Sequence, residues 1–134
     1  MKPERIKEIL ARLEQVKVAV YGDFCLDVYW NMDSEGSEVS VETGLQAESV
    51  EKQRYSLGGA GNIVANIKAL EPKSIKVIGT IGNDIFGKEL QSQLEGQGAD
   101  TSGLMVQNEN FSTYTYIKRM YGDREDPRID FGLH

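Results

Sequence analysis

Hydrophobic residues recur along the chain with helical spacing in some segments and as short continuous runs in others. Pro3 is typical of the first position of a helix, and an apolar stripe follows it at helical spacing. Its members are Ile6, Ile9, Leu10 and Leu13. A short apolar strand at 16–21 comes almost directly afterwards. The leading helix is therefore predicted to be a peripheral element.

The second half of the chain repeats the alternation of helix and strand. A helical pattern from Ile63 to Leu70 stops before Pro72, and an apolar strand is predicted at 74–81. Asp84 is a typical N-cap for the next helix, which Gly96 and Gly98 would end. Further strands are predicted at 104–107, 112–120 and 127–131. Strand, helix and strand in this order indicate an α/β fold with a mainly parallel sheet flanked by helices.

Residues 34–56 do not follow a helical period. Charged, small and apolar residues alternate at 38–43 and again at 45–55. This pattern predicts a two-stranded ribbon that stands outside the main sheet. Because such a ribbon is marginally stable alone and has open edges, we expect it to pair with a second copy and form a homodimer.

A glycine-rich segment, Leu57-Gly-Gly-Ala-Gly-Asn62, precedes the helical pattern at 63–70. Gly58 and Gly59 would let a ligand touch bare backbone, and the Asn62 amide can both donate and accept hydrogen bonds. Free N–H groups at the start of the helix would favour a polar or anionic ligand. A dinucleotide-binding loop would need a third glycine that is missing here. A flexible turn before a helix stays open as the simpler interpretation.

A carboxylate among aromatic residues follows the first strand. Asp27 stands between Phe24 and the pair Tyr29-Trp30. Carboxylate oxygens accept hydrogen bonds from sugar hydroxyls, and flat apolar rings can cover the C–H faces of a sugar. Asp27 is therefore a candidate sugar ligand, although a turn or surface acid would look the same in the sequence.

Four segments in a fixed order resemble the N-terminal part of a ribokinase-like (PfkB) carbohydrate kinase. The resemblance is closer to the kinase domain that phosphorylates heptose 7-phosphate in bacteria. The segments are Val18 to Asp23 with Leu26 to Trp30, Leu57 to Asn62, Val77 to Gly87, and Arg128 to Phe131. Four segments in the family's order are far more specific than any one of them.

The resemblance implies that Asp27, Gly58, Gly59 and Asn62 bind sugar hydroxyls and that the ribbon at 34–56 is a lid over the sugar. It implies an intact protein that transfers the γ-phosphoryl group of ATP, with Mg²⁺, to a hydroxyl of a sugar or sugar phosphate. The family's general base lies in a Gly-Ala-Gly-Asp segment that is absent here. We therefore expect residues 1–134 to be the acceptor-binding part. The catalytic base and the nucleotide-binding part are expected outside this chain, which alone should be inactive and bind neither ATP nor Mg²⁺.

A phosphate on the sugar would need cations, and Lys118 and Arg128 are the candidates. The resembling heptose kinases carry a lysine and an arginine two residues apart in one strand, whereas Tyr116 and Lys118 take these positions here. One positive charge is lost, so phosphorylated and unphosphorylated sugars, heptose phosphate among them, all remain candidates. A solvated charge cluster is the alternative interpretation.

Composition restricts the partners, the cellular location and the metal sites that the chain is expected to have. The net charge of −6 and the pI of about 4.8 argue against nucleic acid or an anionic membrane as a partner. No apolar run approaches the ~18 residues of a membrane span, and the charged first 15 residues do not form a signal peptide, so a cytoplasmic protein is expected. One cysteine and one histidine, His134, exclude a His/Cys metal site.

Every assigned residue binds rather than reacts, which leaves a rival function open. The chain would then be a non-catalytic sugar-binding or dimerisation module. Because 134 residues is about half the length of the resembling kinases, we expect the natural protein to continue beyond His134.

Overall fold

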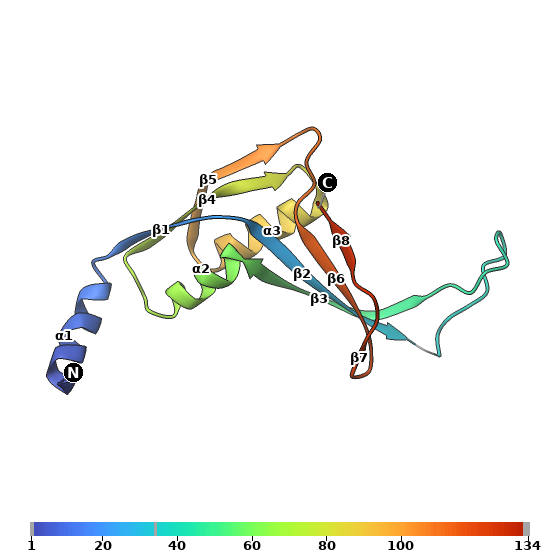
Figure 1. The fold of residues 1–134 in the computed structure, drawn as a ribbon, viewed down its shortest axis with the longest axis horizontal. Coiled ribbons are helices and arrows are strands. Elements are labelled where there is room, and N and C mark those ends of the chain that lie inside the picture. Colours follow the sequence, from blue (N-terminus) through green and yellow to red (C-terminus); the bar gives the residue numbers. More distant parts are fainter. Residues whose placement is uncertain (1, 34, 133–134) are drawn as a thin grey trace.

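The computed structural model describes residues 2–33 and 35–132, so His134 lies outside the described residues. Three helices and eight strands follow one another in these residues, and Figure 1 shows their arrangement. They are α1 (Pro3–Leu13), β1 (Lys17–Tyr21), β2 (Phe24–Asp33), β3 (Ser49–Gly59), α2 (Ala60–Lys68), β4 (Ser74–Gly82), α3 (Ile85–Gly96), β5 (Ala99–Gln107), β6 (Thr115–Tyr121), β7 (Arg124–Glu125) and β8 (Ile129–Phe131).

The first sheet has three parallel strands in the order β1-β4-β5. In its centre, β4 pairs with β1 on one side and with β5 on the other. The helix α3 connects β4 to β5, as in a βαβ unit. The predicted α/β architecture with a parallel sheet and flanking helices is confirmed.

The second sheet has five strands and is larger than the predicted two-stranded lid. Its order is β3-β2-β6-β7, with β8 also paired to β6. The strands β2 and β3 are antiparallel, whereas β2 and β6 are parallel. This pairing places a late segment of the chain, β6, beside an early one, β2 (Figure 1).

The strand boundaries within the ribbon differ from the prediction. Residues 38–43 are not a strand, and between β2 and β3 the described residues contain one isolated bridge, from Val39 to Gln46. The partner of β3 is β2, which begins directly after Gly22-Asp23. The segment after Gly22-Asp23 forms a strand because Phe24, Leu26 and Val28 are buried and the residues between them are not. This period of two marks a strand with one face in the core.

One hydrophobic core lies between the two sheets and the helices α2 and α3. Residues from both sheets and both helices are almost fully buried in it. They include Phe24, Leu26, Val28, Val64, Val77, Leu90, Leu94 and Ile117. Two residues of the predicted helical stripe, Ile63 and Leu70, are instead exposed, because α2 packs through Ala60, Gly61 and Val64.

The predicted N-cap of α3 is confirmed and also ties α3 to a distant loop. One Asp84 carboxylate oxygen accepts a hydrogen bond from the Gly87 N–H at 2.7 Å. The other oxygen accepts one from the Thr113 N–H at 2.8 Å. Asp84 therefore fixes the segment that leads into β6.

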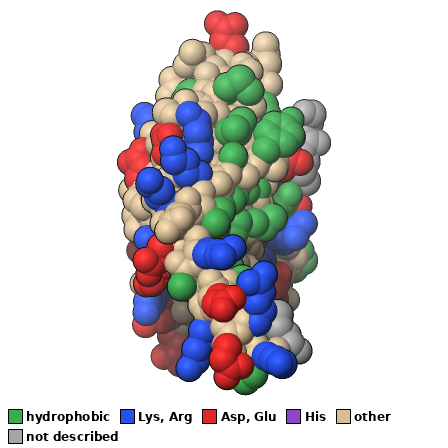
Figure 2. Space-filling view, turned by 90° about the vertical axis from the view of Figure 1, so that its left-hand side faces the viewer, with side chains coloured by type: hydrophobic (Ala, Val, Ile, Leu, Met, Phe, Trp, Pro, Cys, Tyr) green, Lys and Arg blue, Asp and Glu red, His purple; other side chains and the backbone are tan. Residues whose placement is uncertain are grey.

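The helix α1 is peripheral, as predicted. None of its residues is buried, and Figure 1 shows it at one end of the molecule, apart from both sheets. Figure 2 views this side, where hydrophobic side chains gather between charged ones. In the part of the chain that the structure describes, no helix has the length and apolarity to cross a membrane.

Candidate functional site

One face of the five-stranded sheet carries polar side chains from three neighbouring strands. On β2 it comprises Cys25, Asp27, Tyr29 and Asn31, which alternate with the buried residues. Directly opposite on β3 stand Gly58, Ser56, Arg54 and Lys52, and on β6 stand Tyr116 and Lys118. Paired residues of neighbouring strands project to the same side of a sheet. We call this surface the polar face.

Lys118 and Asp27 form an ion pair in the middle of the polar face. The Lys118 ammonium lies 3.1 Å from Asp27 Oδ1 and 3.0 Å from the Tyr29 hydroxyl, to which it also donates. Both charged side chains are about one-fifth exposed. Partial burial alone would lower the pKa of Lys118, but the hydrogen bonds to Tyr29 and Asp27 and the attraction of the Asp27 carboxylate raise it overall. Lys118 is therefore a fixed cation.

Gly58 leaves the space that Asp27 and Cys25 occupy. A Cβ at position 58 would lie 2.6 Å from Cys25 Sγ and 2.8 Å from Asp27 Oδ2. The backbone of β3 can thus approach both side chains closely. Burial of the Cys25 thiol raises its pKa, as does the neighbouring Asp27 carboxylate, so the thiol is protonated at neutral pH.

Gly59 joins β3 to α2 in a conformation that only glycine adopts easily. Its φ of 52° lies in the left-handed region, and a Cβ there would lie 2.6 Å from the Asp23 carbonyl oxygen. The Ala60 N–H donates to the same carbonyl at 3.0 Å. Asn62 follows in the first turn of α2 and is exposed to solvent. The end of β3, the first turn of α2 and the exposed Asn62 therefore follow one another directly along the chain.

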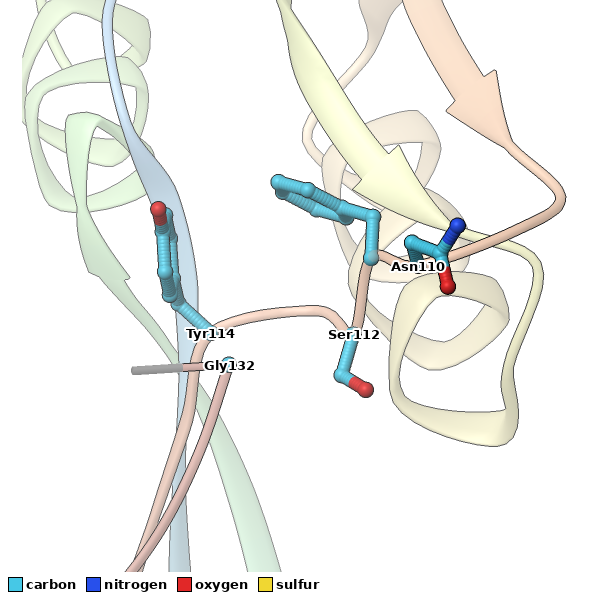
Figure 3. Close-up of a pocket in the computed structure, with 5 residues that line it drawn as sticks. Asn110, Ser112, Tyr114 and Gly132 are labelled. Atoms are coloured by element: carbon cyan, nitrogen blue, oxygen red, sulfur yellow. The ribbon is translucent and has the colours of Figure 1, made fainter. Parts of the chain in front are cut away.

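Two hollows flank the aromatic pair Phe111–Tyr114, whose ring centroids are 5.7 Å apart. One hollow, of ≈ 370 Å³, lies at the carboxyl ends of β1 and β4 and includes Asp23. The other, of ≈ 520 Å³, is shown in Figure 3, where Ser112 and Tyr114 project to different sides of their loop. The carboxyl ends of parallel strands are the usual ligand sites of open α/β sheets.

The structure brings some of the predicted site residues together and leaves others apart. Asp27 forms an ion pair with Lys118 and lies beside the Gly58 position. Arg128 is bound to Asp130 by two hydrogen bonds of 2.6 and 2.8 Å, and its guanidinium lies 4.6 Å from the centroid of the Tyr116 ring. Tyr116 is paired with Asp27 on β2, so the Tyr116 ring stands between Arg128 and Asp27.

Sequence reasoning named Tyr29 only as one of the aromatic residues near Asp27, and it did not identify Arg54 as a site residue. The Arg54 guanidinium lies 3.9 Å from the centroid of the Tyr29 ring, and the Lys118 ammonium lies 4.5 Å from the same centroid. The sequence signal for these two residues was the alternation of polar side chains at every second position in 25–31 and in 52–58. It became informative only once the pairing of the strands was known.

Comparison with known proteins identifies the family of the chain. Residues 15–127 match the family model of the pfkB family carbohydrate kinases. The chain therefore belongs to the pfkB family of carbohydrate kinases, and the family resemblance deduced from the sequence is confirmed.

Relatives of known sequence include the bifunctional protein HldE of Citrifermentans bemidjiense, which is 33% identical over 131 residues. This alignment covers 97% of the chain and 26% of the relative. HldE of Desulfatibacillum aliphaticivorans is 40% identical over 91 residues, or 67% of the chain and 18% of the relative. The chain thus spans about a quarter or less of the curated relatives that it matches.

Solved structures show the same fold at lower identity. A carbohydrate kinase from Agrobacterium tumefaciens superposes with a TM-score of 0.65 at 17% identity, covering 86% of this chain and 35% of the other. A ribokinase from Cryptococcus neoformans in complex with ADP has a TM-score of 0.60 at 20% identity, covering 87% and 34%. The fold therefore matches about a third of each of these ribokinase-like kinases.

Proposed function

We propose that the chain is the acceptor-binding part of a carbohydrate kinase. The intact protein would transfer the γ-phosphoryl group of ATP to a hydroxyl of a sugar or sugar phosphate, a heptose phosphate being one such acceptor. The observation that carries the proposal is the contact of Asp27 with the Gly58 position and with Lys118 on one polar face of the second sheet. Membership of the pfkB family favours this function over a non-catalytic binding module.

Each residue of the polar face would have a distinct part in binding. The Asp27 carboxylate would accept hydrogen bonds from sugar hydroxyls, Lys118 would hold that carboxylate in place, and Gly58 would leave room for it. The backbone of Gly58 and Gly59 and the amide of Asn62 would contact further hydroxyls. Binding of this kind orients one hydroxyl for in-line attack, and positioning is a large part of catalysis in phosphoryl transfer.

ATP and Mg²⁺ belong to the proposal for the intact protein. Two of the solved kinases with this fold are complexes with ATP or ADP. In residues 2–33 and 35–132 there is no group of three His, Cys, Asp or Glu residues that could hold a metal ion. We therefore assign no residue of the described chain to Mg²⁺, which would neutralise phosphate charge during transfer.

Phosphoryl transfer by the intact protein tests the proposal. ADP formation would be followed with ATP, Mg²⁺ and a panel of hexoses, heptoses and their phosphates. We expect one acceptor class to stimulate ADP formation and Asp27→Asn to raise its KM. The matched control is Asp126→Asn, which removes a carboxylate that directly follows β7 and pairs with Arg124 outside the polar face. Absence of stimulation by every acceptor would contradict the proposed function.

A further inference from the structure

Tyr29 lies between two cations in the middle of the polar face. On β2 it stands two residues from Asp27, and the strand register pairs it with Arg54 of β3 on one side and with Lys118 of β6 on the other. Residues that face each other across neighbouring strands project to the same side of the sheet and lie within contact range. Side chains from three strands therefore meet at Tyr29.

The Tyr29 hydroxyl shares the Lys118 ammonium with the Asp27 carboxylate. Lys118 Nζ lies 3.0 Å from the Tyr29 hydroxyl oxygen and 3.1 Å from Asp27 Oδ1, and it donates a hydrogen bond to each. An ammonium group has three donors and no acceptor, so it can bind both oxygens at once. The two oxygens together hold the ammonium in one place.

The ring of Tyr29 attracts the same ammonium and a second cation. The Lys118 ammonium lies 4.5 Å from the ring centroid, and the Arg54 guanidinium lies 3.9 Å from it. A cation within about 6 Å of an aromatic centroid is attracted by the negative face of the ring. Arg54 thereby restricts the ring, and the position of the ring determines where its hydroxyl lies.

Lys118 needs these anchors because its own side chain is flexible. A lysine carries a compact charge on a four-carbon stem, and ordering such a stem costs conformational entropy. Both side chains of the ion pair are only about one-fifth exposed, so the position of the ammonium matters more than it would in bulk water. A second anchor on Lys118 therefore determines how well its ion pair with Asp27 is defined.

The ion pair in turn determines how the Asp27 carboxylate meets a ligand. Its Oδ1 accepts from Lys118, whereas its Oδ2 lies on the Gly58 side, 2.8 Å from the position that a Cβ would take there. Each carboxylate oxygen can accept about two hydrogen bonds, so both retain capacity for sugar hydroxyls. Rotation of the carboxylate would move these acceptors relative to the glycine segment.

We infer that Tyr29 is a positioning residue for the acceptor, because it holds Lys118 against Asp27 and so presents the Asp27 carboxylate to the sugar in one orientation. This inference rests on the proposed function. Tyr29 acts through Lys118 rather than on the reacting atoms. Since the sugar is held alike before and during phosphoryl transfer, loss of this positioning should raise the KM of the acceptor and leave kcat nearly unchanged.

Steady-state kinetics of the intact protein test the inference. The probe is ATP with Mg²⁺ and whichever hexose, heptose or sugar phosphate of the panel gives the highest rate. Tyr29→Phe removes the hydroxyl and keeps the ring, and it should raise the acceptor KM about three- to tenfold with kcat within about twofold of the wild type. Tyr29→Leu removes the ring as well and should raise the KM further.

The matched control is Tyr55→Phe on β3. Tyr55 is paired with the buried Val28, on the opposite face of the same sheet, and its hydroxyl donates to Gln53 at 2.9 Å. This variant should leave the acceptor KM unchanged. An equal rise of the KM in Tyr55→Phe and Tyr29→Phe would assign the effect to the stability of the sheet and overturn the positioning role.

A double-mutant cycle separates positioning from direct contact. In the Lys118→Met background, Tyr29→Phe should change the acceptor KM by less than about twofold, since the group through which Tyr29 acts is gone. The full effect of Tyr29→Phe in that background would overturn the inference. So would an unchanged KM of Tyr29→Phe in the otherwise wild-type protein.

The reactivity of Cys25 gives a test that does not depend on sugar binding. Burial raises the pKa of the Cys25 thiol, as do Asp27 and Asp23, whereas Lys118 lowers it. If Tyr29 holds Lys118 in place, Tyr29→Phe should shift the pH at which iodoacetamide alkylates Cys25 upward, as Lys118→Met does but by less.

The two kinds of measurement distinguish failure of the inference from failure of the proposed function. An upward shift of the alkylation pH in a protein that no sugar stimulates would support the hold of Tyr29 on Lys118 while contradicting the proposed function. No shift, or a downward one, in a protein that phosphorylates a sugar would contradict the positioning role while the proposed function stood.

Discussion

The ammonium of Lys118 lies 3.1 Å from the carboxylate of Asp27, although 91 residues separate them in the chain. The parallel pairing of β2 with β6 brings the two residues together, with Tyr29 as the residue opposite Lys118. An ion pair that is about four-fifths buried fixes both side chains more firmly than an exposed one would. Asp27 is thus preorganised to accept hydrogen bonds from a ligand.

Removal of the Asp27 charge should weaken sugar binding far more than folding. In the intact protein, Asp27→Asn should cost roughly 1.5–3 kcal/mol of sugar-binding free energy, because a charged hydrogen-bond acceptor is lost. The asparagine oxygen can still accept a hydrogen bond from Lys118, but the attraction between the two charges is lost, so the melting temperature should fall only modestly. Calorimetric titration measures the sugar affinity, and thermal unfolding measures the melting temperature. Unchanged sugar affinity with lost stability would make Asp27 a structural residue.

Gly58→Ala should destabilise the chain by about 1–3 kcal/mol, because the new methyl group would overlap Cys25 Sγ and Asp27 Oδ2. Gly96→Ala is the control, since nothing lies within 4 Å of a Cβ there, and it should stabilise α3 by about 0.5–1 kcal/mol. Urea unfolding measures both effects. Equal stability of Gly58→Ala and the wild type would refute the tight packing of this site.

The thiol of Cys25 should report on the charges of the polar face. Burial and Asp27 raise its pKa, whereas Lys118 lowers it. Asp27→Asn should therefore shift the pH at which iodoacetamide reacts with Cys25 downward, and Lys118→Met should shift it upward. The pH dependence of the alkylation rate, followed by mass spectrometry, gives the answer. Shifts of the same sign in both variants would be inconsistent with this arrangement.

Self-association through the segment between β2 and β3 remains a prediction. Val39, Val41 and Leu45 are each more than half exposed there, and Figure 1 shows this segment projecting from the molecule. Apolar side chains on a projecting segment favour pairing with a second copy. Val41→Glu with Leu45→Glu should convert a dimer to a monomer in light scattering, whereas Ile85→Glu, an exposed site on α3, should not. A wild-type chain that is monomeric at high concentration would argue against the prediction.

Much of the first sheet could be predicted from local patterns. The apolar run before Gly82, the cap at Asp84 and the left-handed Gly98 each determine a boundary without reference to distant residues. The glycine segment likewise indicates a close backbone approach, which the structure shows at Gly59. These features depend on neighbours within a few residues, so the sequence displays them directly.

The second sheet could not be predicted in the same way, because its pairing is non-local. The strand β2 was not distinguished from a loop around Asp27, since its polar residues alternate with core residues whose burial depends on β6 and α2. Arg54 and Tyr29 likewise became neighbours only through the register of β2 and β3. Contacts between strands far apart in sequence determined the part of the site that sequence reasoning missed.

A map of where an acceptor sugar binds tests the central claim most directly. Amide resonances of the isotope-labelled chain would be followed during titration with hexoses, heptoses and their phosphates. The account predicts that the largest shifts fall on Asp27, Gly58, Gly59 and Asn62, with none on α1, and that Asp27→Asn abolishes them. Shifts confined to other surfaces, or the absence of any shift at millimolar sugar, would contradict the assignment of the polar face as the acceptor site.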